Sequence, residues 1–158
     1  MVTVLGVRTK EKSTKELFEK LVTLSKKHSL ILQAFDPDSI VSPRHLAYTF
    51  ELASRSFQSK TNVARSFETE LLLRAAGTEK IDEAIERVGV KSPSQILLFS
   101  NLQIPGSLLK GFGEEDSSLL KLTTEKKKKI ARLFKIKEKE LGLYPLEELV
   151  LERLAIRF

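Results

Sequence analysis

The stretch VTVLGVRTKEKSTKELFEKLVTLSKKHSLILQAF, residues 2–35, decides the fold class. Residues 2–7 are apolar and partly β-branched, and residues 30–35 are similarly apolar, so we expect two strands. Between them Ser13 and Glu16 stand three residues apart, as in a capping box, which predicts the start of a helix. The chain therefore begins with a strand, a helix and a second strand. Four apolar residues share one face of the helix: Phe18, Leu21, Val22 and Leu24.

Capping residues predict three further helices. Ser42 is a favourable N-cap, and Pro43 suits the first helical position, where its missing N–H costs nothing. A second helix, SFETELLLRAA, stops at Gly77, because glycine readily adopts the positive φ found after a helix C-cap. Thr78 is placed to cap a third helix that ends at Gly89. The apolar residues of this third helix are expected to face inward: Ile81, Ala84, Ile85 and Val88.

The last third of the chain predicts two more strands and two more helices. Residues 96–100 are a short apolar run bounded by polar residues, which is typical of a buried strand, and residues 118–122 are expected to form a short edge strand. TTEKKKKIARLF (123–134) predicts a helix with a threonine cap. PLEELVLERLAIRF (145–158) predicts a terminal helix with proline in its first turn.

These elements predict an α+β fold. We expect a small, mostly antiparallel or mixed sheet of about four strands, packed with several helices. The order of elements also suits a short parallel unit, so the strand directions stay open. With 158 residues the chain is long enough to bury a core, and it fits one domain spanning residues 1–158.

Composition narrows the class of protein. The chain is 41% hydrophobic and 30% charged, which is typical of a globular domain and too apolar for a disordered one. No apolar run approaches the ~20 residues of a membrane span, and the first residues lack a signal-peptide core, so we expect a cytoplasmic protein with no membrane partner. The absence of cysteine excludes disulfides, thiolate metal sites and cysteine nucleophiles. A net charge of +6 favours a polyanionic partner, although charge alone is a weak signal.

The sequence contains no recognisable catalytic arrangement. The segment GFG (111–113) lacks the other residues of a phosphate-binding loop and is typical of a turn. His28 and His45 have no partner motif. His45 near Asp36 and Asp38 is either an acid–base pair or a structural polar group at a helix start, and we favour the structural role. We therefore predict a protein that is not an enzyme and that uses no cofactor or metal.

Two segments carry alternatives that the sequence leaves open. The lysine run 126–129 wraps around a helix, which favours a solvated surface over phosphate contacts without sequence information. From Leu146 to Phe158, eight of thirteen residues are apolar, a wider arc than one sheet face needs. Either this terminal helix is central to its own core, or part of the arc docks on another protein.

The stretch FQSKTNVARSFETELLLRAAG (57–77) places polar donors around an apolar run. Asn62 either shapes the bend between two helices or bonds a ligand. Arg74 either pairs with Glu70, four residues before it on the same helix face, or carries a phosphate. Glu70 can also accept bonds from backbone donors, and for Glu70 we favour a structural role.

Three segments together resemble the kinase-binding regulatory subunit of the KEOPS complex, the PRPK-binding protein family, in its archaeal form. The most specific features are, in order, Ile-Val-Ser at 40–42, the bridge of Asn62 with Arg65-Ser66, Glu70 before a leucine run, and Ile81-x-x-Ala-Ile ending at Gly89. The segments are FDPDSIVSPRHLAYTFELA (35–53), TNVARSFETELLLRAAGTEKIDEAIERVGV (61–90) and LTTEKKKKIARLFKIKEKELGLYPLEELVLERLAIRF (122–158).

The resemblance implies a noncatalytic subunit in the synthesis of N6-threonylcarbamoyladenosine (t6A37) in tRNA. Such a subunit binds and stimulates a small atypical kinase/ATPase and, through it, joins the threonylcarbamoyl-transferring subunit. Archaeal members also hold the single-stranded CCA 3′ end of tRNA. The alternative is a stand-alone module that binds single-stranded RNA or tRNA, whereas a small metabolic enzyme has almost no support.

The resemblance also implies two sets of site residues. A single-stranded RNA end needs cations for phosphates, polar groups for base edges and apolar surface for stacking. One departure is Lys80, because many archaeal relatives carry glutamine just before the Ile-x-x-Ala motif, and a base-edge contact would become a charge contact. The expected tRNA-binding residues are Lys60, Asn62, Arg65, Arg74, Lys80 and Ile81. The expected kinase-binding residues are Leu149, Val150, Ile156 and Phe158.

Overall fold

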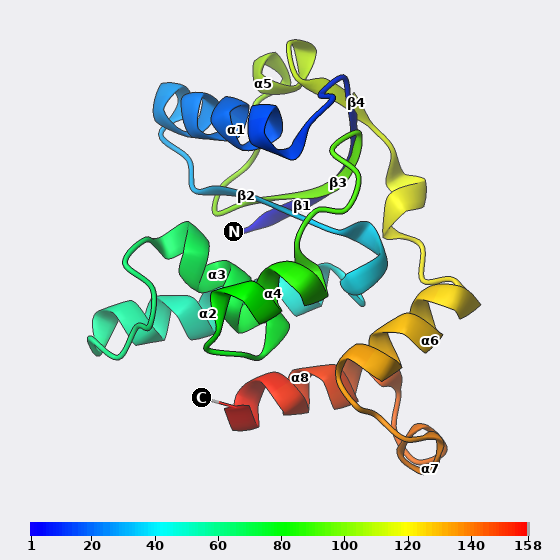
Figure 1. Cartoon of the computed structure of the whole chain (residues 1–158). Coiled ribbons are helices and arrows are strands. Elements are labelled where there is room, and N and C mark those ends of the chain that lie inside the picture. Colours follow the sequence, from blue (N-terminus) through cyan, green and yellow to red (C-terminus); the bar gives the residue numbers. More distant parts are fainter. Residues whose placement is uncertain (158) are drawn as a thin grey trace. The chain divides into compact units, whose positions relative to one another are not determined.

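The structure is a computed structural model that describes residues 1–157 (Figure 1). The chain divides into two compact units, each built from two separate segments. The first comprises residues 1–37 and 89–121, and the second comprises residues 38–88 and the chain from residue 122 onward. A short 3₁₀ helix, η1 (Pro37–Ser39), stands where the chain passes from one unit to the other. Among the described helices, none is both long and apolar enough to span a membrane.

The first unit is built on a four-stranded sheet in the order β2-β3-β1-β4, with every pair antiparallel. β3 pairs with both β1 and β2 and lies between them in the sheet. The first two strands of the chain are therefore not neighbours. The α+β prediction with about four strands is confirmed, and the strand directions are now settled. The strands are β1 (Thr3–Thr9), β2 (Leu32–Phe35), β3 (Gln95–Ser100) and β4 (Gly113–Glu115).

Helices α1 (Thr14–His28) and α5 (Gly106–Lys110) cover one face of this sheet (Figure 1). α1 begins as predicted, because the Ser13 side chain accepts a hydrogen bond from the Glu16 backbone N–H at 3.1 Å. α5 was not predicted from the sequence. Alternate residues of the strands meet the helices in one core, whose fully or nearly fully buried members include Val7, Leu17, Leu21, Ala34, Ile96, Leu98, Leu108 and Phe112.

The predicted edge strand at residues 118–122 is wrong. The Asp116 side chain accepts a hydrogen bond from the Ser118 backbone N–H at 3.0 Å, which turns the chain into a 3₁₀ helix, η2 (Ser117–Leu120). The edge strand lies earlier, at Gly113–Glu115, where it pairs with the end of β1. There a Cβ on Gly113 would stand 2.3 Å from the Arg8 carbonyl oxygen, so the close pairing requires glycine.

The second unit is helical. Ser42 and Thr123 cap their helices as predicted, and Ser66, which was not predicted as a cap, does the same: each side chain accepts a backbone N–H three residues later. The cap predicted at Thr78 is wrong, because its hydroxyl accepts the Lys80 N–H at 3.2 Å and the helix begins later, at Ile81. Gly77 ends α3 with φ at 68°, as predicted. The short helix α7 was not predicted. The helices are α2 (Pro43–Gln58), α3 (Phe67–Ala76), α4 (Ile81–Val88), α6 (Thr124–Leu133), α7 (Glu138–Leu141) and α8 (Leu146–Arg157).

A separate core holds the second unit together. Ile130 and Phe134 from α6 and its end pack with Leu146, Val150 and Leu154 of α8. In α4 only Ala84 and Val88 face inward as predicted, whereas the prediction for the two isoleucines is wrong: Ile81 is 48% exposed and Ile85 is 50% exposed. The short α4 buries one narrow stripe, so these isoleucines lie on its solvent side.

Candidate functional site

The turn between α2 and α3, residues 59–66, is held by one buried carboxylate. Glu70 on α3 has no exposed surface. One of its oxygens accepts the backbone N–H groups of Val63 at 2.9 Å and Ala64 at 2.8 Å. The other accepts the Ser56 hydroxyl at 3.0 Å and the Arg74 Nε at 3.0 Å. The predicted structural role of Glu70 is confirmed, and it fixes the turn to both flanking helices.

The backbone of the turn is also braced from within. The Thr61 N–H donates to the Ser56 carbonyl at 2.8 Å, and Lys60 adopts φ of 60°, the left-handed region that few side chains favour. The Asn62 amide donates to the Ala64 carbonyl at 2.8 Å, so Asn62 shapes the bend. Lys60 and Arg65 are exposed, which leaves two cations on the outer side of a rigid turn.

Arg74 and Lys80 are placed differently from those two cations. The Arg74 residue is only 5% exposed, and its Nη2 lies 3.0 Å from Glu70, so its charge is committed within the protein. Lys80 is exposed and stands 3.8 Å from Glu83 across one turn of α4. Ile81 follows at the start of α4 and presents apolar surface. Of the six expected RNA residues, Lys60, Arg65, Lys80 and Ile81 are therefore accessible.

A hollow of about 380 Å³ opens beside the turn. Arg74 reaches this hollow while bonded to Glu70, and the exposed Arg55 joins it from α2. Sequence analysis did not find Arg55, because it lies 19 residues before Arg74 and only the helix packing brings the two together. The hollow is lined by Tyr48, Leu52, Arg55, Ser56, Ser59, Thr61, Val63, Arg74, Glu79 and Ala155.

The expected kinase-binding residues separate into two groups. Leu149 is 3% exposed and Val150 is fully buried, and both belong to the core of the second unit. At these two positions α8 packs into its own core, which is the first of the two alternatives. Leu149 and Val150 therefore hold the helix in place and present no surface to a partner. Ile156 is 74% exposed near the end of α8. Phe158 lies outside the described residues.

His45 joins α2 to α3 inside the second unit. Its Nδ1 accepts the Val41 backbone N–H at 3.3 Å, and its Nε2 donates to the Ala75 carbonyl at 2.9 Å. Its ring packs against the edge of Phe134, with centroids 5.8 Å apart. Burial lowers the pKa of His45 to about 4. Both ring nitrogens bond to backbone groups, which leaves neither for a carboxylate and confirms the predicted structural role.

Acidic and imidazole groups do not gather elsewhere into a coordination site. Across residues 1–157 no group of three or more His, Cys, Asp or Glu side chains could hold a metal ion. The polar groups that the structure concentrates around Glu70 are bonded to one another and to the backbone of the turn. What this arrangement offers a ligand is a fixed surface with exposed cations on it.

The fold and this braced turn define a small α+β protein with a preformed cationic surface. Residues 9–158 match the family model described as "Kinase binding protein CGI-121". "Regulatory protein Cgi121" of Methanocaldococcus jannaschii is 29% identical over 128 residues, which are 80% of this chain and 83% of that relative. "KEOPS complex subunit Cgi121" of Pyrococcus abyssi is 27% identical over 103 residues, 65% of this chain and 57% of that relative. Because the family match spans nearly the whole chain, this protein belongs to the CGI-121 kinase-binding family.

Proposed function

We propose that this protein is the noncatalytic regulatory subunit of a KEOPS complex that makes t6A37 in tRNA. It binds and stimulates the small kinase/ATPase subunit, and through that subunit it joins the threonylcarbamoyl-transferring subunit in the cytoplasm. The observation that carries this proposal is the family match over residues 9–158. The names of the two relatives, a regulatory protein and a KEOPS subunit, support the same role.

We also propose that the turn at residues 59–66 and the start of α4 hold the CCA 3′ end of tRNA. Exposed Lys60, Arg65 and Lys80 are available for phosphates, and Ile81 offers apolar surface to a base. Asn62 shapes the turn, and Arg74 lines the hollow beside it. Because Glu70 holds the turn in place before binding, little conformational entropy is lost when the RNA arrives.

For the kinase, the exposed part of α8 is the proposed contact. Ile156 provides an accessible apolar side chain, Leu149 and Val150 anchor the helix from inside, and the proposal retains Phe158 as a contact. Replacing Ile156 with glutamate puts a charge where apolar contact is expected, and it leaves the core untouched. Val22→Glu on α1 is a matched control, because Val22 is also an exposed apolar residue, at 53%.

The kinase experiment measures capture of the purified KEOPS kinase subunit and the rate of its ATP hydrolysis. We expect wild-type protein and Val22→Glu to capture the kinase and raise its ATP hydrolysis, and Ile156→Glu to lose at least tenfold in affinity. A wild-type protein that binds tRNA yet captures no kinase would reject the regulatory role in favour of a stand-alone RNA-binding module. Equal capture by both variants would reject α8 as the contact.

The RNA experiment compares intact tRNA with tRNA lacking its terminal CCA at one fixed salt concentration. We expect the shortened tRNA to bind more weakly. The double variant Lys60→Gln/Arg65→Gln should lower affinity for intact tRNA about tenfold, because two phosphate contacts are lost. Lys15→Gln/Lys27→Gln on α1 removes the same charge from another exposed surface and serves as control. Equal affinity of the wild-type protein for both RNAs contradicts the 3′-end proposal.

A further inference from the structure

The excess charge of this protein is concentrated in one short segment of the second unit. Residues 122–139 contain eight lysines and arginines against two glutamates. This excess of six equals the net charge of the entire chain, so all other residues together are neutral. The exposed members form what we call the α6–α7 cationic surface: Lys127, Lys128, Arg132, Lys135, Lys137 and Lys139.

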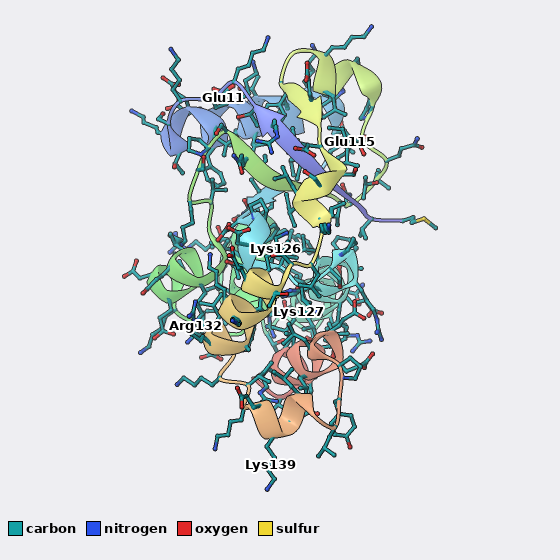
Figure 2. The ribbon with its side chains drawn as sticks, turned by 90° about the vertical axis from the view of Figure 1, so that its right-hand side faces the viewer. Glu11, Glu115, Lys126, Lys127, Arg132 and Lys139 are labelled. Carbon is teal, nitrogen blue, oxygen red and sulfur yellow. The ribbon has the colours of Figure 1, made fainter. Side chains whose placement is uncertain are left out.

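Folding sorts the lysines of this segment into buried and exposed positions. Lys126 is only 8% exposed, whereas its neighbours Lys127 and Lys128 are on the surface. Figure 2 looks onto α6, which carries Lys127 and Arg132, and shows Lys139 extending outward from α7. Within residues 1–157 no ion pair joins Lys127, Lys128, Arg132 or Lys139 to an acidic side chain. These charges are therefore available to an external partner.

The surroundings of these charges distinguish among three anionic partners. Binding to a membrane surface requires an exposed apolar helix face. The apolar side of α6 packs in the core instead, where Ile130 is fully buried and Phe134 is 7% exposed, so a membrane is disfavoured. Protein interfaces favour aromatic residues and arginine over lysine, yet five of the six exposed cations are lysines, and Phe134 is the one aromatic residue of the segment. Dispersed lysine charges without stacking groups suit the phosphates of a nucleic acid backbone.

The position of this surface separates it from the turn proposed to hold the RNA end. Phe134, at the end of α6, packs on His45 near the start of α2. The braced turn follows the other end of α2, at Gln58, and the helix between spans about 20 Å. Figure 1 likewise shows α6 at one end of this unit and the α2–α3 turn at the other. If the end of an RNA is held at the turn, a different segment of that RNA therefore lies near α6.

We propose that the α6–α7 cationic surface binds the phosphate backbone of double-stranded RNA, namely the stem that adjoins the single-stranded end assigned to residues 59–81. This inference rests on the proposed function. Side chains read double-stranded RNA mostly through its shape and phosphates, which requires no base-specific groups. The surface adds affinity and orientation without sequence preference.

The test uses the triple variant Lys127→Gln/Lys128→Gln/Arg132→Gln. Its matched control is Lys15→Gln/Lys26→Gln/Lys27→Gln, which removes three exposed charges from α1. Affinity is measured between 50 and 200 mM salt for intact tRNA, for tRNA lacking CCA and for a short single strand ending in CCA. All six substituted side chains are exposed, so both proteins should unfold at the wild-type temperature.

The α6 triple variant should bind both tRNAs about 10- to 100-fold more weakly than wild type. The slope of log affinity against log salt should fall by about two to three, because up to three phosphate contacts are lost. Its affinity for the short single strand should be unchanged, and the α1 control should match wild type throughout. These results together would support a contact with the stem.

Several outcomes would overturn the inference. One is an α6 variant whose tRNA affinity and salt slope equal those of the α1 control. Another is an equal loss of affinity for the short single strand, which would place the surface on the RNA end. A loss of kinase capture with RNA binding intact would assign the surface to an acidic protein. If wild-type protein binds both tRNAs equally, only the 3′-end proposal is rejected. The stem proposal is then still tested by comparing the affinities of the α6 variant and the α1 control for either tRNA. Absence of any tRNA binding rejects both.

Discussion

Glu70 decides more about the candidate site than any cation in it. A buried carboxylate needs several donors to offset the loss of water, and here two backbone N–H groups, a hydroxyl and a guanidinium supply them. The consequence for Arg74 is large, because a guanidinium that neutralises Glu70 is poorly placed to neutralise a phosphate as well. The exposed Lys60, Arg65 and Lys80 therefore carry the electrostatic part of the proposed RNA contact.

His45 should make stability depend on pH below neutrality. Its pKa is lowered to about 4 in the folded protein, against an ordinary value of 6.5, so the unfolded chain binds the proton more readily. The contribution to stability is complete above pH ~6.5 and is lost as pH falls toward ~4. From this group alone, the free energy of unfolding should fall by about 2 kcal/mol between pH 7 and pH 5.

Urea unfolding of the wild-type protein and of His45→Gln at the two pH values checks this expectation. Glutamine can also bond to the backbone but does not titrate, so the variant should be less stable at pH 7 and nearly independent of pH. An equal fall in the variant would assign the pH dependence to other groups.

At the scale of elements, signals within a few residues set the helix ends, whereas the sheet edge depends on a distant partner. Ser13, Ser42, Ser66 and Thr123 cap helices through backbone groups three residues away, so sequence alone locates these starts. The edge strand instead exists because residues 113–115 meet the end of β1, about a hundred residues earlier in the chain. Leu119, which made the 118–122 run resemble a strand, is buried in a 3₁₀ turn.

Replacing Gly113 should damage this edge, because a Cβ there would stand 2.3 Å from the Arg8 carbonyl oxygen. We expect Gly113→Ala to lower the free energy of unfolding by about 1–3 kcal/mol, since the backbone of β4 or β1 must shift. Gly111 is a matched control in the same segment, because a Cβ there meets nothing within 4 Å. Gly111→Ala should be neutral or slightly stabilising. Thermal unfolding of the wild-type protein and both variants measures the two effects. Equal effects at the two positions would show that the β1–β4 pairing is not tight.

At the scale of the whole molecule, two of the buried apolar clusters are built from different elements. One is assembled from the sheet with α1 and α5, and the other from α6 and α8 with residues near α2. The two clusters share no residue, and each unit takes segments from both halves of the chain. The expectation of a single domain over residues 1–158 stays a prediction, because the two compact units can still unfold as one cooperative domain.

Small cavities in the two cores should have additive effects if the cores are energetically independent. Ile96 lies in the first core and Ile130 in the second, and both are fully buried. Each Ile→Val substitution should lower the free energy of unfolding by about 0.5–1.5 kcal/mol. The double variant should lose the sum of these to within about 0.5 kcal/mol in urea unfolding. A larger departure from the sum would show that the cores are coupled.

Sequence alone was enough to predict the α+β class, three of the four strands, the caps at Ser13, Ser42 and Thr123 and the stop at Gly77, because these depend on periodicity and on contacts within a few residues. It also singled out the cations of the turn. Three further facts needed the folded structure: Leu149 and Val150 lie in a core, Arg74 pairs with Glu70, and the edge strand of the sheet lies at residues 113–115. Burial and strand pairing depend on which distant segments meet, and local sequence does not specify those meetings.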